Sequence, residues 1–261
     1  MNKKKWKIIL CLGILICVVC LGTFGWITYK DYRARKDREA ALAKIEGSDF
    51  TERDGEEPDL PEGLRHGDDI DFEQLEEIND ELYAWIYVPG TKIDYPGAHS
   101  ETDDSYYLKY NFKKEPEFAG CIYTEKYNKK DFSDPNTVMY GHNMKNGSMF
   151  QNLHKFEDGE FFDKHKYVFV YTPKKTYVYT IFAAYKYDNR HLLKSFDFDK
   201  EDVFENYLKN VLSTRQMSSH IREEQEVTKK DRILTLSTCV GGEPDNRYLV
   251  QAVLTDERDA K

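Results

Sequence analysis

The chain has 261 residues, 14% of them aromatic, with 38 basic and 47 acidic residues and a formal net charge of −9. Five lysines and no acids fall within the first 30 residues, so the remainder holds 33 basic and 47 acidic residues, a net charge of −14. The size and aromatic content indicate one well-filled domain with appended segments, and the acidic balance argues against nucleic acid as a partner.

An uncharged apolar segment extends from Ile8 to Ile27. Twenty helical residues at about 1.5 Å each span about 30 Å, the thickness of the hydrocarbon core of a bilayer. Residues 1–29 are therefore predicted to form a short cytoplasmic tail and a transmembrane signal-anchor. A cleavable signal peptide is the competing interpretation, but the segment is long for one, and no A-x-A-like cleavage site follows it.

Basic residues flank the predicted span on both sides, so the positive-inside rule alone does not decide its orientation. The N-terminal tail is short, which favours a single-pass protein of the cell membrane with an extracellular C-terminal domain. Residues 30–69 are predicted to form a helical stalk and an acidic flexible linker, because helix formers are followed by Gly, Pro and many acids. The folded domain is expected at residues 70–261.

The domain is predicted to be mainly β with added helices. Apolar, aromatic and β-branched runs separated by turn residues suggest an antiparallel barrel or sandwich. The expected strands are 84–88, 120–123, 137–140, 167–171, 176–187, 232–236 and 248–254. Helical spacing of apolar residues predicts a helix near residues 72–82, a second at 148–156 and a longer one at 200–214.

Three of the five cysteines lie in the apolar N-terminal segment, which leaves Cys121 and Cys239 in the domain. Two cysteines allow one disulfide, but a single possible pair is not the framework that small secreted domains use. At least one thiol is therefore available for chemistry. A thiol acts as a nucleophile only as thiolate, and it needs a base or cation nearby and a donor for the oxyanion.

Each residue that could take part in this chemistry also has an ordinary structural interpretation. His142 follows the apolar run before Gly141, where a loop histidine with a satisfied hydrogen bond is the simpler interpretation. Cys239 alone is more often a buried apolar residue, and Arg247 alone is a surface ion-pair partner. His99 is interpreted as an exposed loop histidine, because Asp, Ser and Gly surround it.

Taken together, these residues carry a resemblance. The sequences KDRILTLSTC, with an arginine eight residues after the cysteine, and NTVMYGHNM upstream resemble the sortase family of membrane-anchored cysteine transpeptidases, class B. The resemblance extends from about Phe72 to Leu254. It implies an eight-stranded sortase-type β-barrel with N-terminal helices and a long helix between the strands that flank the substrate groove.

The resemblance also implies roles for individual residues. Cys239 would be the nucleophile, His142 the general acid and base, and Arg247 the donor that positions the substrate and stabilises the oxyanion. Ser237 and Thr238, within TLSTC, would line the substrate groove. The amides of the segment after Cys239, including that of Val240, are further candidate donors.

The implied partners are surface proteins with a C-terminal sorting signal and an amine of the peptidoglycan precursor. The signal would be cleaved after Thr, and class B relatives use either Asn-Pro-x-Thr-Asn-like or Pro-x-Thr-Gly-like motifs. The linker before Lys200 and the segment from Gln216 to Thr228 are expected to help shape the groove. Two alternatives remain: a membrane-tethered cysteine protease that uses water as acceptor, and a catalytically silent surface-binding module.

No metal and no other cofactor is expected. The acids Asp103, Asp104, Asp131 and Asp134 do not form an EF-hand loop. His154 and His165 lack the close spacing of a metal-binding histidine pair.

Overall fold

The computed structural model describes residues 19–26, 28–29, 32–33, 36 and 70–260. The chain divides into two units, Met1–Thr51 and Glu52–Lys261. Among the described residues there is no helix with both the length and the apolar character that a membrane crossing requires. Most of the predicted span at 8–27, and nearly all of the predicted stalk and linker, lie outside the described residues.

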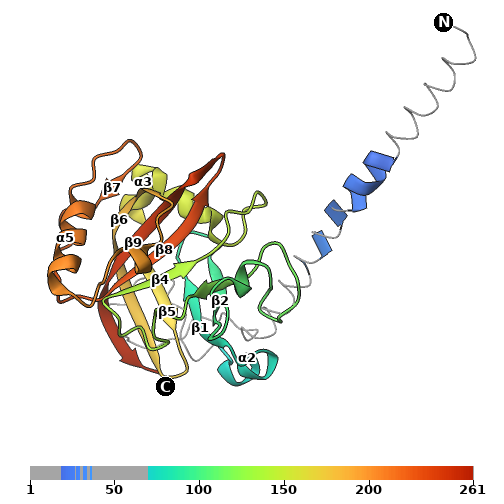
Figure 1. The fold of residues 1–261 in the computed structure, drawn as a ribbon, viewed down its shortest axis with the longest axis horizontal. Helices are drawn as coiled ribbons and strands as arrows, with labels where there is room; N and C mark the ends of the chain where they lie inside the picture. The colour runs from blue at the N-terminus through green and yellow to red at the C-terminus, as the bar shows by residue number, and fades with distance from the viewer. Residues whose placement is uncertain (1–18, 27, 30–31, 34–35, 37–69, 261) are drawn as a thin grey trace, which may run out of the picture. The chain divides into compact units, whose positions relative to one another are not determined.

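Eight strands of the second unit form a closed barrel in the order β5-β1-β2-β3-β4-β8-β9-β6, which the β5–β6 pairing closes (Figure 1). Strand β7 pairs only with β6 and lies outside the ring. This confirms the predicted eight-stranded barrel. The strands are β1 (Leu82–Tyr87), β2 (Asp94–His99), β3 (Ile122–Thr124), β4 (Asn136–Tyr140), β5 (Tyr167–Tyr171), β6 (Lys175–Asp188), β7 (His220–Ile221), β8 (Ile233–Val240) and β9 (Glu243–Asp259).

Short helices join these strands. The α-helices are α2 (Phe72–Ile78), α3 (Gly159–Lys164), α4 (Leu192–Ser195) and α5 (Glu201–Leu212), and the 3-10 helices are η2 (Tyr106–Leu108) and η3 (Phe150–Glu157). Helix α5 corresponds to the helix predicted at 200–214, and its apolar face packs on the outside of the barrel beside β6 (Figure 1). The helix predicted at 148–156 forms as η3.

Strand β2 was not predicted, because its sequence DYPGAH contains the strand-breaking residues Pro96 and Gly97. His99 ends this strand and is only 2% exposed, so its predicted exposure is wrong. The His99 ring lies 2.9 Å through Nδ1 from the Thr124 hydroxyl and meets the Tyr83 ring edge-on. Strands β1 and β3 flank β2 and bury this segment, although its local sequence is typical of a turn.

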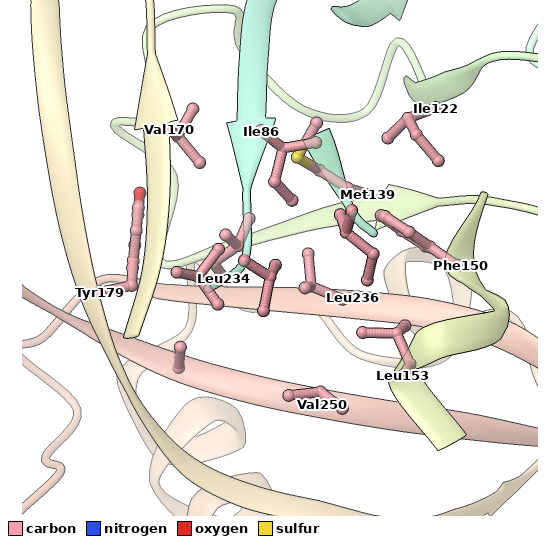
Figure 2. Close-up of a cluster of buried hydrophobic side chains, with 14 of the residues drawn as sticks. Ile86, Ile122, Met139, Phe150, Leu153, Val170, Tyr179, Leu234, Leu236 and Val250 are labelled. Carbon is pink, nitrogen blue, oxygen red and sulfur yellow. The ribbon is translucent and has the colours of Figure 1, made fainter. Parts of the chain in front are cut away.

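The barrel is buried on both faces along β8 and β9. Leu234, Leu236 and Val250 point into the barrel interior (Figure 2). Ile233 and Leu249 belong to a second cluster that includes the buried face of α5. Alternate side chains of a strand face opposite ways, so the two strands link both clusters. Burial of each such side chain contributes roughly 1.5–3 kcal/mol, which makes β8 and β9 a rigid base for the residues at their ends.

A buried polar network joins α5 to the barrel. The side-chain amide of Gln251, which is fully buried, donates to the Tyr207 hydroxyl at 2.7 Å and to the Thr235 hydroxyl at 2.8 Å. Thr235 in turn donates to Asn136 on β4 at 2.8 Å, and Tyr185 donates to the Gln251 carbonyl oxygen at 3.2 Å. Because every link spans different elements, the network fixes β4, β6, β8, β9 and α5 relative to one another.

Candidate active site

Strand pairing brings His142, Cys239 and Arg247 to one place on the barrel. Strands β4 and β8 run parallel with Tyr140 paired to Ser237, so His142 and Cys239 each lie two residues beyond a matched pair. Strands β8 and β9 run antiparallel, and Cys239 is paired directly with Arg247. Residues separated by 97 and by eight positions in the sequence therefore meet at the same end of three adjacent strands.

These residues line one cavity of about 220 Å³. Ser237 and Cys239 have the same parity on β8 as Ile233, which packs under α5, so their side chains belong to the outer face of the barrel. Helix α5 packs on that face together with Ile233 and Leu249. The lining residues are Leu108, Tyr123, Tyr140, Gly141, His142, Tyr187, Asn189, Arg190, His191, Leu192, Ser237, Thr238, Cys239, Arg247 and Leu249.

Cys239 is an exposed, free cysteine at the end of a strand that is otherwise buried. Cys121 is also free, but it is buried, and its sulfur lies 3.6 Å from the Pro96 carbonyl oxygen. The two cysteines of the domain therefore form no disulfide with each other. An accessible thiol at the mouth of a cavity suits a nucleophile, whereas the buried thiol suits a packing role.

The His142 ring is held from two sides. Its Nε2 lies 2.9 Å from the Leu108 carbonyl oxygen, and its ring stacks on Phe118 at 5.7 Å between centroids. A carbonyl oxygen only accepts, so Nε2 carries the proton in this contact and Nδ1 is left as the nitrogen that can exchange a proton. The Phe150 amide donates to the His142 carbonyl at 3.0 Å, which fixes the main chain as well.

The Arg247 guanidinium is half-buried and donates through Nη1 to the carbonyl oxygens of Pro244 and Asn246, at 3.0 and 2.9 Å. No acid among residues 70–260 lies within ion-pair distance of it. The nearby acid Glu243 is engaged elsewhere, because Lys186 and Asn246 hydrogen-bond to it and lower its pKa. The guanidinium charge thus remains available to a ligand in the cavity.

Ser237 and Thr238 both border the cavity but have different surroundings. The Thr238 hydroxyl is buried and donates to the Gly141 carbonyl oxygen at 2.8 Å. The Gly141 amide donates back to the Ser237 carbonyl oxygen at 3.2 Å. These two bonds fix the turn that carries His142 against the strand that carries Cys239.

A polar wall of the same cavity was not singled out from the sequence. His191 Nε2 lies 2.9 and 2.7 Å from the two carboxylate oxygens of Glu125, which is buried. Tyr140 and Tyr187 complete this wall, and burial raises the pKa of both phenols, so they stay neutral. The one sequence signal for the Glu125–His191 pair is the position of Glu125, directly after the apolar strand that begins at Ile122. An acid that is buried at such a position needs a partner in the fold.

Tyr187 on β6 and residues 189–192, which belong to the linker before Lys200, line the cavity. The segment from Gln216 to Thr228 does not contribute to the described lining. Within the described part of the chain, no group of three or more His, Cys, Asp or Glu residues could hold a metal ion.

Comparisons with known proteins show which family this chain is similar to. A sortase-domain family model matches residues 86–255. Sortase B of Listeria monocytogenes is 36% identical over 169 residues, which cover 65% of this chain and 67% of the relative. Sortase B of Staphylococcus aureus is 32% identical over 168 residues, which cover 64% and 67%.

Solved structures of sortase B are similar to this chain as well. The crystal structure of Clostridium perfringens sortase B has a TM-score of 0.65 at 34% identity and covers 71% of this chain and 100% of that chain. A Staphylococcus aureus sortase B–substrate complex has a TM-score of 0.61 at 29% identity and covers 71% and 84%. With the family model spanning most of the barrel, the chain belongs to the sortase family, class B, a family of cysteine transpeptidases.

Proposed function

We propose that this sortase cleaves the C-terminal sorting signal of surface proteins after Thr and transfers the new carboxyl end to an amine of peptidoglycan or its precursor. The observation that carries the proposal is the shared cavity of Cys239, His142 and Arg247. It supplies a nucleophile, a proton-transfer group and a permanent cation in one place, which acyl transfer requires.

The first half of the reaction forms a thioester. The Cys239 thiolate attacks the Thr carbonyl carbon, and the carbonyl electrons move onto oxygen, where the Arg247 guanidinium stabilises the charge. The intermediate collapses by breaking the C–N bond, and His142 protonates the departing amine. Removal of one oxyanion donor typically costs about 10²–10³ in kcat, which sets the contribution expected of Arg247.

The second half resolves the thioester. An incoming amine attacks the thioester carbonyl while His142 accepts its proton, and the C–S bond breaks to release the Cys239 thiolate and the new amide. One imidazole can serve both halves, because the ordinary pKa of histidine lies near neutral pH. The contact between His142 and the Leu108 carbonyl would hold the ring in place through both proton transfers.

The lining of the cavity supports recognition of a peptide. Ser237 and Leu249 would form the floor beside the nucleophile, and the polar wall of His191 and Tyr187 would face the residues before the scissile bond. Thr238 would act through the Gly141 turn, since its hydroxyl is already bonded there. Both the Asn-Pro-x-Thr-Asn-like and the Pro-x-Thr-Gly-like motif remain candidate signals.

Membrane anchoring belongs to the same proposal. The uncharged sequence from Ile8 to Ile27 supports a single span that holds the enzyme at the outer face of the cell membrane. There it would meet both the exported substrate and the peptidoglycan precursor.

A product assay tests the proposal. The purified full chain is incubated with fluorogenic peptides containing Thr-Asn or Thr-Gly, with and without a glycine-based or diamino-acid amine. Amine-dependent ligation product that disappears in Cys239→Ala supports transpeptidation. Turnover with water alone at every amine concentration would identify a protease instead. An absence of turnover, together with a Cys239 that resists alkylation in the folded protein, would favour a silent binding module.

A further inference from the structure

A second histidine lies behind the nucleophile. His154 on η3 places Nε2 at 3.0 Å from the main-chain carbonyl oxygen of Cys239. Its other nitrogen, Nδ1, is 2.6 Å from a carboxylate oxygen of Glu157. The side-chain amide of Asn143 donates to the same Cys239 oxygen at 2.9 Å. Two donors from different segments therefore meet at one carbonyl oxygen, that of the residue carrying the exposed thiol.

The partners of His154 limit the hydrogen-bonding roles of its two nitrogens. The Glu157 carboxylate only accepts, so Nδ1 donates in that contact. The Cys239 carbonyl oxygen only accepts, whereas the Asn143 amide nitrogen only donates, so Nε2 either donates to the carbonyl or accepts from Asn143. Tyr248 on β9 stacks on the ring at 5.1 Å, and burial raises the pKa of that phenol, so it adds no charge. The remaining groups against the ring are the Asn143 amide, 3.1 Å from Nε2, and Cys239 itself.

The Cys239 carbonyl that these donors hold lies at an irregular point of the β8–β9 pairing. The β8–β9 pairing shifts register between Cys239, paired with Arg247, and Val240, paired with Glu243. Regular pairing therefore ends at the nucleophile. The Cys239 carbonyl shares a rigid peptide plane with the Val240 amide, so holding its oxygen fixes the orientation of both residues.

We propose that His154 and Glu157 are a positioning pair for the nucleophile. Through Nε2 as a donor, and together with Asn143, His154 holds the main chain of Cys239 so that the thiolate meets the substrate carbonyl between His142 and Arg247. This inference rests on the proposed transpeptidase function and adds to it. Neither His154 nor Glu157 lines the cavity, so both act on the nucleophile through its main chain.

Steady-state kinetics of the full chain separate this role from a structural one. His154→Ala is expected to lower kcat about 10- to 100-fold with little change in KM, because small displacements of a reacting group cost rates of this order. His154→Gln keeps a donor for the carbonyl and is expected to recover most of the loss. Lys155→Ala is the matched control, since Lys155 lies next on η3 but bonds to the Gly90 carbonyl, and its kcat should match the unmodified chain.

Glu157→Gln supplies the second readout. The carboxylate orients the ring of His154 through Nδ1, so its loss is expected to lower kcat with little change in KM, and by less than His154→Ala does.

Nitrogen-15 spectra of the histidine rings complete the test without reference to activity. A proton on His154 Nε2 is expected, because the Cys239 carbonyl oxygen only accepts, and an Nε2 without a proton would overturn the proposal. An active unmodified chain with unchanged kcat in both His154→Ala and Glu157→Gln would also overturn it. An unmodified chain without amine-dependent product would instead contradict the proposed function, so the two failures are distinguishable. Thermal melts verify that each variant is folded.

Discussion

Cys239 and Arg247 face each other as a directly paired couple across strands β8 and β9. The seven residues between them form the end of β8, the turn at Gly241 and Gly242, and the start of β9. The guanidinium and the thiol therefore sit side by side on the outer face of the barrel and share one cavity. Their separation is fixed by main-chain pairing and does not depend on flexible loop contacts.

This pairing predicts that the charge and the shape of Arg247 both matter. Arg247→Ala is expected to lower kcat by about 10²–10³ in the ligation assay through loss of an oxyanion donor. Arg247→Lys should restore little, because an ammonium lacks the planar fork of donors. Arg258→Ala, at the far end of the same strand, serves as the control and should leave the rate unchanged. Activity of Arg247→Ala equal to that of Arg258→Ala would contradict the assignment.

Gly141 is predicted to tolerate no side chain. A Cβ atom there would lie 2.5 Å from Ile122 Cδ1 and 2.7 Å from the Phe150 ring, both in the core. Gly141→Ala should therefore lower the free energy of unfolding by about 1–3 kcal/mol and displace the adjacent His142. Urea denaturation measures the stability loss. Gly241→Ala is the matched control, since the nearest atom to its Cβ is 3.9 Å away, and equal losses for the two variants would refute the steric explanation.

Gln251 is predicted to be a stabilising residue, although it is polar. Gln251→Ala leaves the hydroxyl groups of Tyr207 and Thr235 without this partner inside the protein. An unsatisfied buried group costs about 1–3 kcal/mol, so a loss of about 3 kcal/mol in unfolding free energy is expected. Gln216→Ala, at an exposed position after α5, should change stability by less than about 0.5 kcal/mol. A loss of that small size in Gln251→Ala would indicate that the network contributes nothing net.

His99 is predicted to make stability depend on pH. Burial lowers the pKa of His99 below its usual value, because the charged ring would be taken out of water. The unfolded chain therefore binds a proton more readily than the folded chain, and the free energy of unfolding should fall as pH drops through about 6.5. The loss should level off below the folded-state pKa.

Urea midpoints at several values between pH 8 and pH 5 measure this effect. His99→Gln removes the titrating ring, so the stability advantage of the unmodified chain over this variant should shrink as pH falls. Parallel curves for the two proteins across that range would show that His99 does not titrate differently in the folded state.

Local patterns were sufficient for much of the fold and for the identity of the site residues. The aromatic run at Tyr167–Tyr171 is a strand with those bounds, and the apolar spacing after Lys200 forms α5. Such elements are readable because period and composition reflect which face is buried. The motif around Cys239, with His142 upstream and Arg247 downstream, likewise indicated the family before any contact was known.

Other features depend on partners that are distant in sequence. Pro96 and Gly97 disfavour a strand locally, and only the flanking strands β1 and β3 turn that segment into one and bury His99. The Glu125–His191 pair and the His154–Glu157 contact with Cys239 join segments whose spacing carries no signal.

By itself, the sequence determined the chemistry available to this protein: two cysteines in the domain, an imidazole, a guanidinium and a barrel-forming pattern. Only the tertiary structure decided which residues lie together at the site. The parallel pairing of β4 with β8 and the antiparallel pairing of β8 with β9 set the register of these three strands. Side-chain identity is local, whereas register follows from the packing of the whole barrel.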